Sequence, residues 1–269
     1  MEKLPVLISI PHGGHDIPEM YRDRILLSGR EVFIDSDTWS RILYGLEDRV
    51  ECLVAPETAR AFVDLNRATG SLKTAFRDGV MRNRTHNGEL IWKPGQEPDP
   101  EEIRDILETH YYPLHRKLEI FTTRQDLRFA VDCHTMIWRE PRRKGLIERS
   151  PRPIFCISNL GDREGEGTNL SAPAAFVHHM KELLEREFRD VEPFPDTPLV
   201  GINDPFRGGF ITAMHGRRSP WPWVQLEISR ALYLPEDDRI TGEPGPEDLR
   251  RMEEVRQSLY RVLLDLCRA

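Results

Sequence analysis

The most informative stretch for the architecture is Leu4-Pro5-Val6-Leu7-Ile8-Ser9-Ile10, which runs directly into Pro11-His12-Gly13-Gly14. The first seven residues form an almost continuous apolar run of strand length. Such a run predicts a strand buried on both faces, as in a parallel sheet covered by helices. The imidazole and the two glycines come where this strand ends, which is where open α/β sheets place their ligand sites.

Further along the chain, strand-length apolar runs alternate with longer helical patterns. We predict strands over Glu51–Ala55, Ala61–Leu65, Phe129–Cys133, Pro153–Ser158 and Trp223–Ile228. We predict helices over Thr38–Arg49, Pro100–Arg124, Ala172–Arg189 and Pro246–Leu266, with Pro113 bending or interrupting the second of them. This alternation predicts an α/β fold with a sheet covered on both faces. Residues 67–100 are rich in glycine and proline and predict a loop-rich insertion within one domain spanning residues 1–269.

Composition indicates a soluble globular protein. The 269 residues carry 38 Lys+Arg and 45 Asp+Glu, so the formal net charge is 38 − 45 = −7. An acidic balance argues against nucleic acid as the main partner. One local basic cluster is interpreted as a solvated loop or a rim on the substrate side: Arg139, Arg142, Arg143, Lys144 and Arg149.

No stretch approaches the ~18–20 apolar residues of a membrane span, and the short apolar N-terminus predicts a first strand rather than a signal peptide. The four cysteines form no CxxC pair. A reducing cytoplasm is therefore the expected location.

Polar residues that can carry chemistry gather where strands are predicted to end. They fall into four clusters: Pro11-His12-Gly13-Gly14-His15, Asp35-Ser36-Asp37, Asp132-Cys133-His134-Thr135 and Gln225-Leu226-Glu227-Ile228. Two histidines, one or two aspartates and a separate glutamate suffice for zinc catalysis, which needs three ligands, an open position for water and a carboxylate that takes a proton. There is no HExxH helix, so the ligands would come from separate strands.

Each cluster also has a plainer interpretation. Asp35 and Ser36 suit the N-cap of the following helix. Glu227 can be an exposed position of an edge strand; buried, it would have a raised pKa and suit a general base. Asp132 can orient an imidazole or stabilise a loop, and Cys133 beside His134 is a candidate nucleophile of a cysteine hydrolase.

A second group of residues suits substrate binding. Strand-like alternation would put Arg60, Phe62 and Asp64 on one side, with Asn66-Arg67 at the strand end. A guanidinium can bind a substrate carboxylate through two hydrogen bonds. A surface ion pair of Arg67 with a nearby acid is the alternative.

The order of these motifs resembles the N-formylglutamate amidohydrolase family over most of the chain. The resemblance rests on the clusters above, on Val63-Asp64-Leu65-Asn66-Arg67 after Arg60, and on three further motifs: Tyr112-Pro113-Leu114-His115, Gly208-Gly209-Phe210-Ile211-Thr212 and Tyr233. It implies a single three-layer α/β/α catalytic domain with a mixed, largely parallel sheet, phosphorylase/hydrolase-like and distantly similar to the zinc carboxypeptidases.

The resemblance also implies roles for individual residues. One Zn²⁺ per chain would be held by His12, His134 and a carboxylate, with Asp37 preferred to Asp35 and with His15 as a further alternative. Glu227 would be the general base, and Arg60 would polarise the scissile carbonyl. Asn66 and Arg67 would bind the α-carboxylate of the substrate.

The implied activity is hydrolysis of an N-acyl amino acid, first of all N-formyl-L-glutamate, in histidine breakdown. The chain departs from the family pattern at Ala213, where an arginine is typical, and at His215-Gly216, where Tyr-Gly is typical. These departures leave open another N-acyl amino acid or a short peptide as substrate. A non-catalytic protein that binds metal or amino acids is a more distant alternative.

Overall fold

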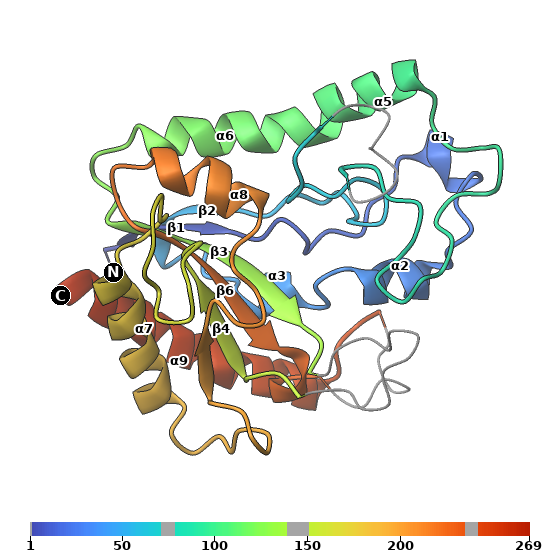
Figure 1. Ribbon diagram of the computed structural model, residues 1–269. Helices are drawn as coiled ribbons and strands as arrows, with labels where there is room; N and C mark the ends of the chain where they lie inside the picture. The colour runs from blue at the N-terminus through green and yellow to red at the C-terminus, as the bar shows by residue number, and fades with distance from the viewer. Residues whose placement is uncertain (1, 71–78, 139–150, 235–241) are drawn as a thin grey trace.

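A computed structural model of the chain describes residues 2–70, 79–138, 151–234 and 242–269. In this part of the chain a six-stranded sheet has the order β2-β1-β3-β6-β4-β5 (Figure 1). The strands are β1 Leu4–Ser9, β2 Val50–Val54, β3 Phe129–Met136, β4 Phe155–Ser158, β5 Val200–Ile202 and β6 Trp223–Ser229. All neighbours pair in parallel except β4, which runs antiparallel to β6. The predicted mixed, mostly parallel α/β sheet is confirmed.

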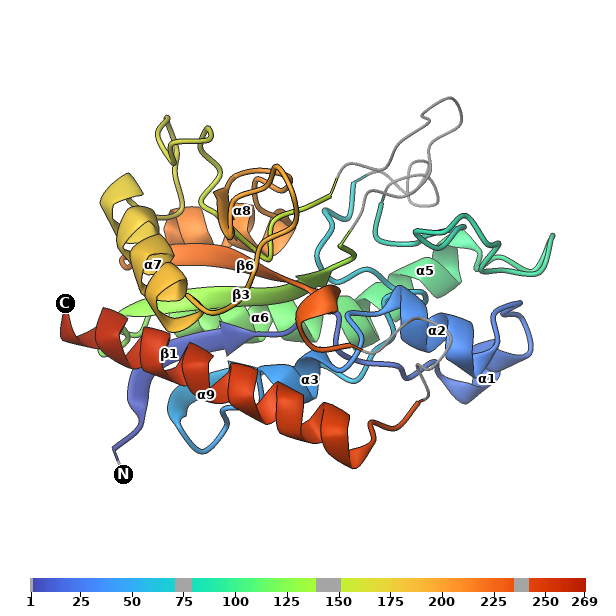
Figure 2. The ribbon, with the colours of Figure 1, turned by 90° about the horizontal axis from the view of Figure 1, so that it is seen from below.

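Helices cover both faces of this sheet (Figures 1 and 2). One face carries α3 Ser40–Leu43, α7 Ala174–Glu187 and α9 Pro246–Arg268. The other carries α5 Pro100–Ile106, the π-helix Leu107–Tyr111, α6 Tyr112–Thr122 and α8 Phe210–Met214. The short helices α1 Glu19–Arg22 and α2 Gly29–Asp35 lie beyond one end of the sheet, and the 3₁₀ turns are Gly216–Arg218 and Arg230–Leu232. None of the helices in the described ranges is both long and apolar enough to cross a membrane.

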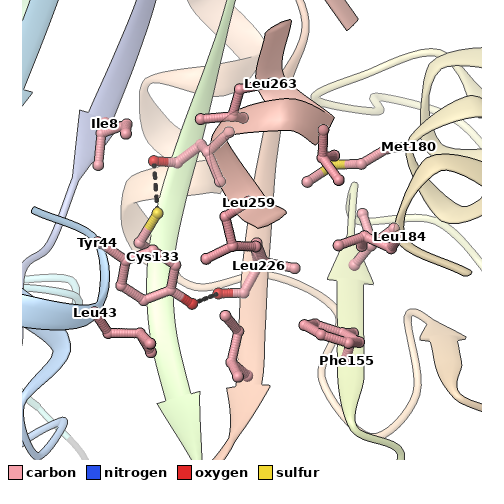
Figure 3. Packing of buried hydrophobic residues seen from close by; sticks show 14 of the residues in the cluster. Ile8, Leu43, Tyr44, Cys133, Phe155, Met180, Leu184, Leu226, Leu259 and Leu263 are labelled. Atoms are coloured by element: carbon pink, nitrogen blue, oxygen red, sulfur yellow. Dashed lines mark hydrogen bonds between the residues drawn. The ribbon is translucent and has the colours of Figure 1, made fainter. Parts of the chain in front are cut away.

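Alternate side chains of β1, β3 and β6 enter two separate hydrophobic cores, one on each face of the sheet. In β3, Val131 and Cys133 pack with the α7 and α9 residues, whereas Ala130 packs with those of α5 and α6. Figure 3 shows Cys133 in the first core, near Ile8 and Leu263. Since successive side chains of a strand point to opposite faces, Asp132 and His134 lie on the face of α6 and α8.

Two predicted elements differ from the structure. Residues 61–65 are a turn and not a strand, because the amides of Phe62 and Val63 bond back to the Ala59 carbonyl at 3.0 and 3.1 Å. The helix predicted over Thr38–Arg49 is reduced to α3. The left-handed conformation of Trp39, with φ of 54°, separates the preceding residues from the helix.

The predicted helix Pro100–Arg124 is present as one rod with an interruption. It begins at Pro100, after the N-cap residue Asp99, which forms a capping box with Glu102. Its middle turn is the π-helix, directly before Pro113. Proline cannot donate to the preceding turn and its ring crowds the carbonyl four residues back, and the wider π turn relieves that crowding.

The other predicted strands and helices are found within a few residues of the expected bounds. The sequence interpretation missed the short elements α1, α2, α8 and β5. In residues 67–70 and 79–99 the chain forms bends, turns and isolated bridges, as expected of a loop-rich insertion. The basic cluster at residues 139–149 lies outside the described residues.

Candidate active site at the carboxyl ends of β1, β3 and β6

Three adjacent parallel strands bring the predicted site residues to one edge of the sheet. His12 follows β1, His134 lies in β3, and Glu227 lies in β6 directly beside His134 in the strand register. All three side chains are buried, with 4%, 3% and 6% of their surface exposed. The location is that of ligand sites in open α/β sheets.

His12, Asp37 and His134 form a compact buried group. One nitrogen or oxygen atom from each lies within 4.8 Å of the others, so the three can hold a metal ion. Asp37 Oδ2 lies 3.0 Å from Nδ1 of His134 and 3.8 Å from Nδ1 of His12. The amide of Asp37 also donates to the His12 carbonyl at 2.9 Å, which ties the loop after α2 to the end of β1.

The second nitrogen of each histidine faces another carboxylate. His12 Nε2 lies 2.8 Å from Asp64 Oδ1, and His134 Nε2 lies 3.4 Å from Asp132 Oδ2. Metal-binding histidines usually have such an outer partner, which fixes the ring orientation and leaves the inner nitrogen for the metal. The donor set, two imidazoles and a carboxylate, suits zinc and also other divalent metals.

The charges of this group are strongly coupled. Burial alone would raise the pKa of Asp37, but the hydrogen bond with His134 and the nearby cations lower it to about 2. Burial alone would lower the pKa of His134, but Asp132 and Asp37 hold it well above its usual value. A metal cation bound between these groups would balance the negative charge of the carboxylates.

The two alternative ligands lie elsewhere. Asp35 Oδ2 pairs with Arg82 at 2.7 Å, and Asp35 Oδ1 lies 3.0 Å from Nδ1 of His86. His15 lies against the Phe33 ring, with Nε2 3.1 Å from the Ser36 hydroxyl. Neither belongs to the compact group.

Glu227 is buried close to this group, so the edge-strand interpretation is wrong. Its Oε1 accepts a hydrogen bond of 2.9 Å from Gln225 Nε2. Burial raises its pKa to about 7, opposed by the charge of His134 and reinforced by that of Asp37. A carboxyl group with this pKa can both take and return a proton near neutral pH.

Arg60 and Arg67 converge on Asp64, which is 1% exposed. Their Nε atoms lie 3.3 and 3.8 Å from Asp64 Oδ2. Arg60 and Asp64 therefore lie on the same side of the backbone, as expected. The reason differs from the expected one: the chain forms a helical turn here, and residues four apart face the same way in such a turn, whereas strand alternation was predicted. Burial alone would raise the pKa of Asp64, but His12 and Arg60 hold it well below its usual value.

Asn66 lies at the centre of the site with both ends of its amide engaged. Its Nδ2 lies 3.0 Å from His134 Nε2, and its Oδ1 accepts from the backbone amide of Ile211, in the first turn of α8, at 2.8 Å. A Cβ atom at Gly209 would lie 2.2 Å from Asn66 Nδ2, so only glycine lets the backbone approach this closely.

These residues line a cavity of ≈ 280 Å³ that is strongly cationic. Its described lining includes two carboxylates, Asp37 and Glu227, and five arginines: Arg60, Arg67, Arg152, Arg207 and Arg230. A pocket with this charge suits a small anion.

The cysteine alternative does not fit the geometry. Cys133 lies on the face of β3 opposite to the cavity, and its Sγ contacts the Val131 carbonyl at 3.7 Å (Figure 3). Burial holds the pKa of this thiol well above its usual value, whereas a nucleophilic cysteine needs a lowered one.

The two positions that depart from the family pattern do not line the cavity. Ala213 lies in α8, and His215 lies behind it with Nε2 2.9 Å from His115 Nδ1. His115 in turn contacts the Leu65 carbonyl at 3.1 Å, next to Asn66.

The sequence interpretation missed the partnership of Asp64 with His12, and it missed Arg230. Arg230 donates to the Ser36 and Ile34 carbonyls and thereby holds the loop that carries Asp37. Two signals in the sequence could have indicated these roles: the position of Asp64 two residues before Asn66-Arg67, and the position of Arg230 directly after the last strand.

Histidines and carboxylates at the edge of an α/β sheet, around a small cationic cavity, are typical of the active site of a hydrolase. A sequence model of the family described as N-formylglutamate amidohydrolase matches residues 4–234. The chain belongs to the N-formylglutamate amidohydrolase family, which is a family of hydrolases acting on an amide bond.

Individual relatives agree with this assignment. An N-formylglutamate deformylase of Pseudomonas putida is 27% identical over 247 residues, 89% of this chain and 85% of that protein. The crystal structure of an N-formylglutamate amidohydrolase from Ralstonia eutropha JMP134 has a TM-score of 0.74 at 20% identity, covering 100% of this chain and 96% of that one. A gene product of Agrobacterium tumefaciens has a TM-score of 0.61 at 15% identity, covering 98% and 88%. The two structures show that the fold is shared.

Proposed function

We propose that this protein is a zinc-dependent amidohydrolase that converts N-formyl-L-glutamate to L-glutamate and formate. The observation that carries the proposal is the buried His12, Asp37 and His134 group next to Glu227, in a cationic cavity. Family membership and the named deformylase relative support the reaction type.

In this proposal His12, Asp37 and His134 would hold one zinc ion. A bound zinc ion supplies Lewis-acid chemistry, which lowers the pKa of a water molecule to ≈ 7 and polarises a carbonyl oxygen. Asp64 and Asp132 orient the two imidazoles from behind, and Arg230 keeps the Asp37 loop in place.

The protein's own residues carry the proton transfers. Glu227 accepts a proton from the water that attacks the formyl carbon, and Arg60 stabilises the negative charge that develops on the formyl oxygen. The C–N bond then breaks, and Glu227 returns the proton to the leaving amine. The products are formate and an amino acid.

Substrate binding is assigned to the mouth of the cavity. The Arg67 side chain is 50% exposed, its Nε lies 3.8 Å from Asp64, and it binds the α-carboxylate of the substrate. Asn66 assists by bracing His134 and α8 beside that carboxylate.

The decisive experiment combines metal analysis with a Glu227→Gln variant. Zinc-reconstituted protein should hold about one zinc per chain, and the variant should keep this zinc while kcat for N-formyl-L-glutamate falls by ~10²–10⁴-fold. A variant with wild-type turnover would remove Glu227 from the mechanism, and a protein that cannot be loaded with zinc would remove the metal.

A second candidate is the same chemistry on another N-acyl amino acid. It is motivated by Ala213 and His215, where the family's typical arginine and tyrosine are absent. A panel of N-formyl and N-acetyl amino acids separates the two candidates. A large preference for N-formyl-L-glutamate excludes the second.

We further propose that residues 1–269 form a single catalytic domain, since β1 near one terminus and α9 at the other belong to one sheet and its covering layer.

The four cysteines are free in the structure, which supports a reducing location such as the cytoplasm.

A further inference from the structure

We propose that Arg207 reads the side-chain carboxylate of the substrate, so that the enzyme selects N-acyl amino acids with an acidic side chain. This inference rests on the proposed function and adds a specificity-determining residue to it. It begins from the excess of positive charge in the cavity, where five arginines face two carboxylates.

Four of these arginines are already engaged by the protein. Arg60 and Arg67 share Asp64. Arg230 donates to two carbonyls of the loop before Asp37. Arg152 donates to the Ile137 carbonyl and lies over the Phe206 ring, 5.0 Å from its centroid.

Arg207 differs from the other four in this respect. Its side chain is exposed and lines the cavity, and no residue in the described ranges forms a hydrogen bond or an ion pair with its guanidinium group. Because Arg67 supplies the group for one carboxylate, Arg207 is available for a second.

The backbone around Arg207 is fixed on both sides. The Ser158 hydroxyl donates to the Phe206 carbonyl at 2.7 Å, and the Leu160 amide donates to the Arg207 carbonyl at 3.0 Å. After the turn at Gly208, where φ is 111°, the Gly209 amide donates to Gln225 Oε1 at 2.6 Å. The backbone that carries Arg207 is therefore anchored to β4 and β6 beside the cavity, so only the side chain has to be ordered when it binds an anion.

The same placement explains how an acidic substrate can be recognised although Ala213 replaces the family's typical arginine. Ala213 lies in α8 and does not line the cavity. Arg207, three residues before α8 begins, does line it. A guanidinium that forms two parallel hydrogen bonds with a carboxylate discriminates against the neutral amide of the same shape.

The test compares N-formyl-L-glutamate with N-formyl-L-glutamine in wild type, Arg207→Gln and Arg207→Lys. In Arg207→Gln we expect kcat/KM for the glutamate substrate to fall about 10- to 100-fold, mainly through KM, while kcat/KM for the glutamine substrate stays within about threefold. Arg207→Lys should recover part of the loss, since it keeps the charge but not the planar fork. Arg189→Gln is the matched control, because Arg189 is 77% exposed and does not line the cavity.

An equal loss for both substrates, or no loss for either, would overturn the inference. Calorimetric binding of free L-glutamate and L-glutamine to the zinc-loaded protein gives a readout that does not need turnover. If the wild type hydrolyses neither substrate, the proposed function fails. A preference for L-glutamate that disappears in Arg207→Gln would still support the assignment of Arg207, and an unchanged preference would contradict it.

Discussion

Replacing Asp64 by asparagine should weaken both zinc binding and folding, although Asp64 is not one of the proposed ligands. Asp64 is 1% exposed and contacts His12 at 2.8 Å and Arg60 at 3.3 Å. Asparagine keeps the shape of the side chain, but it removes the charge and replaces one acceptor oxygen with an NH2 donor. The variant therefore tests whether this buried carboxylate orients the imidazole and neutralises the guanidinium.

The expected magnitudes follow from these two contacts. Loss of the carboxylate partner of a metal-binding histidine typically lowers metal affinity by ~10–100-fold. Two unit charges 3.3 Å apart attract by about 5 kcal/mol at an effective dielectric constant of about 20. Arg60 is 21% exposed, so water offsets part of this term, and we expect the free energy of unfolding to fall by about 3 kcal/mol.

Two assays separate the effects. Competition with a chelator measures the zinc dissociation constant, and urea denaturation of the metal-free protein measures the free energy of unfolding. Asp190→Asn is the control, because Asp190 is 95% exposed and pairs only loosely with Arg189; both measurements should stay at wild-type values. Wild-type zinc affinity in the Asp64 variant would refute the orienting role, and a loss of stability below about 1 kcal/mol would refute the charge argument.

Three further predictions concern the surroundings of the site. The kcat/KM of the zinc-loaded enzyme should increase with pH, and the midpoint of the increase should lie at or below about pH 7. The ionised form of Glu227 accepts the proton, and a bound cation lowers the pKa of Glu227. A kcat/KM that falls between pH 5 and 7 would contradict this. Gly209→Ala should lower kcat/KM at least about tenfold, because the added Cβ would displace Asn66. Gly29→Ala is the control: nothing lies within 4 Å of the added Cβ, so this variant should keep wild-type activity and melting temperature. Tyr44→Phe should cost about 1–3 kcal/mol in urea denaturation, because its hydroxyl donates at 2.8 Å to a buried carbonyl of β3, and a loss below 0.5 kcal/mol would show that this carbonyl has another partner.

Local patterns in the sequence were enough to predict the main strands and the long helices. The apolar runs of β1, β3 and β6 are buried on both faces, and this composition is typical of parallel strands. The polar residues at their ends were therefore expected to meet. The long helix up to Thr122 was also predicted, because Pro100 suits the first turn of a helix, and Glu101 and Glu102 favour its positive end.

Residues 61–65 show where local patterns failed. Their alternation favours a strand, but no strand in the described part of the chain pairs with them, and the amides of Phe62 and Val63 bond back to the Ala59 carbonyl instead. Strand formation depends on pairing partners that are distant in the sequence, which no local window contains. The three-residue strand β5 was missed for the same reason.

By itself, then, the sequence determined the fold class and which residue types can carry the chemistry, because burial and periodicity are properties of short segments. Only the tertiary structure separated Asp37 from Asp35, placing the first beside His134 and the second beside Arg82. It also showed that Asp64 contacts the outer nitrogen of His12, and that Cys133 lies on the face of its strand away from the cavity. These outcomes depend on distances between segments up to 97 residues apart, and such distances are set by packing of the whole chain rather than by any local pattern.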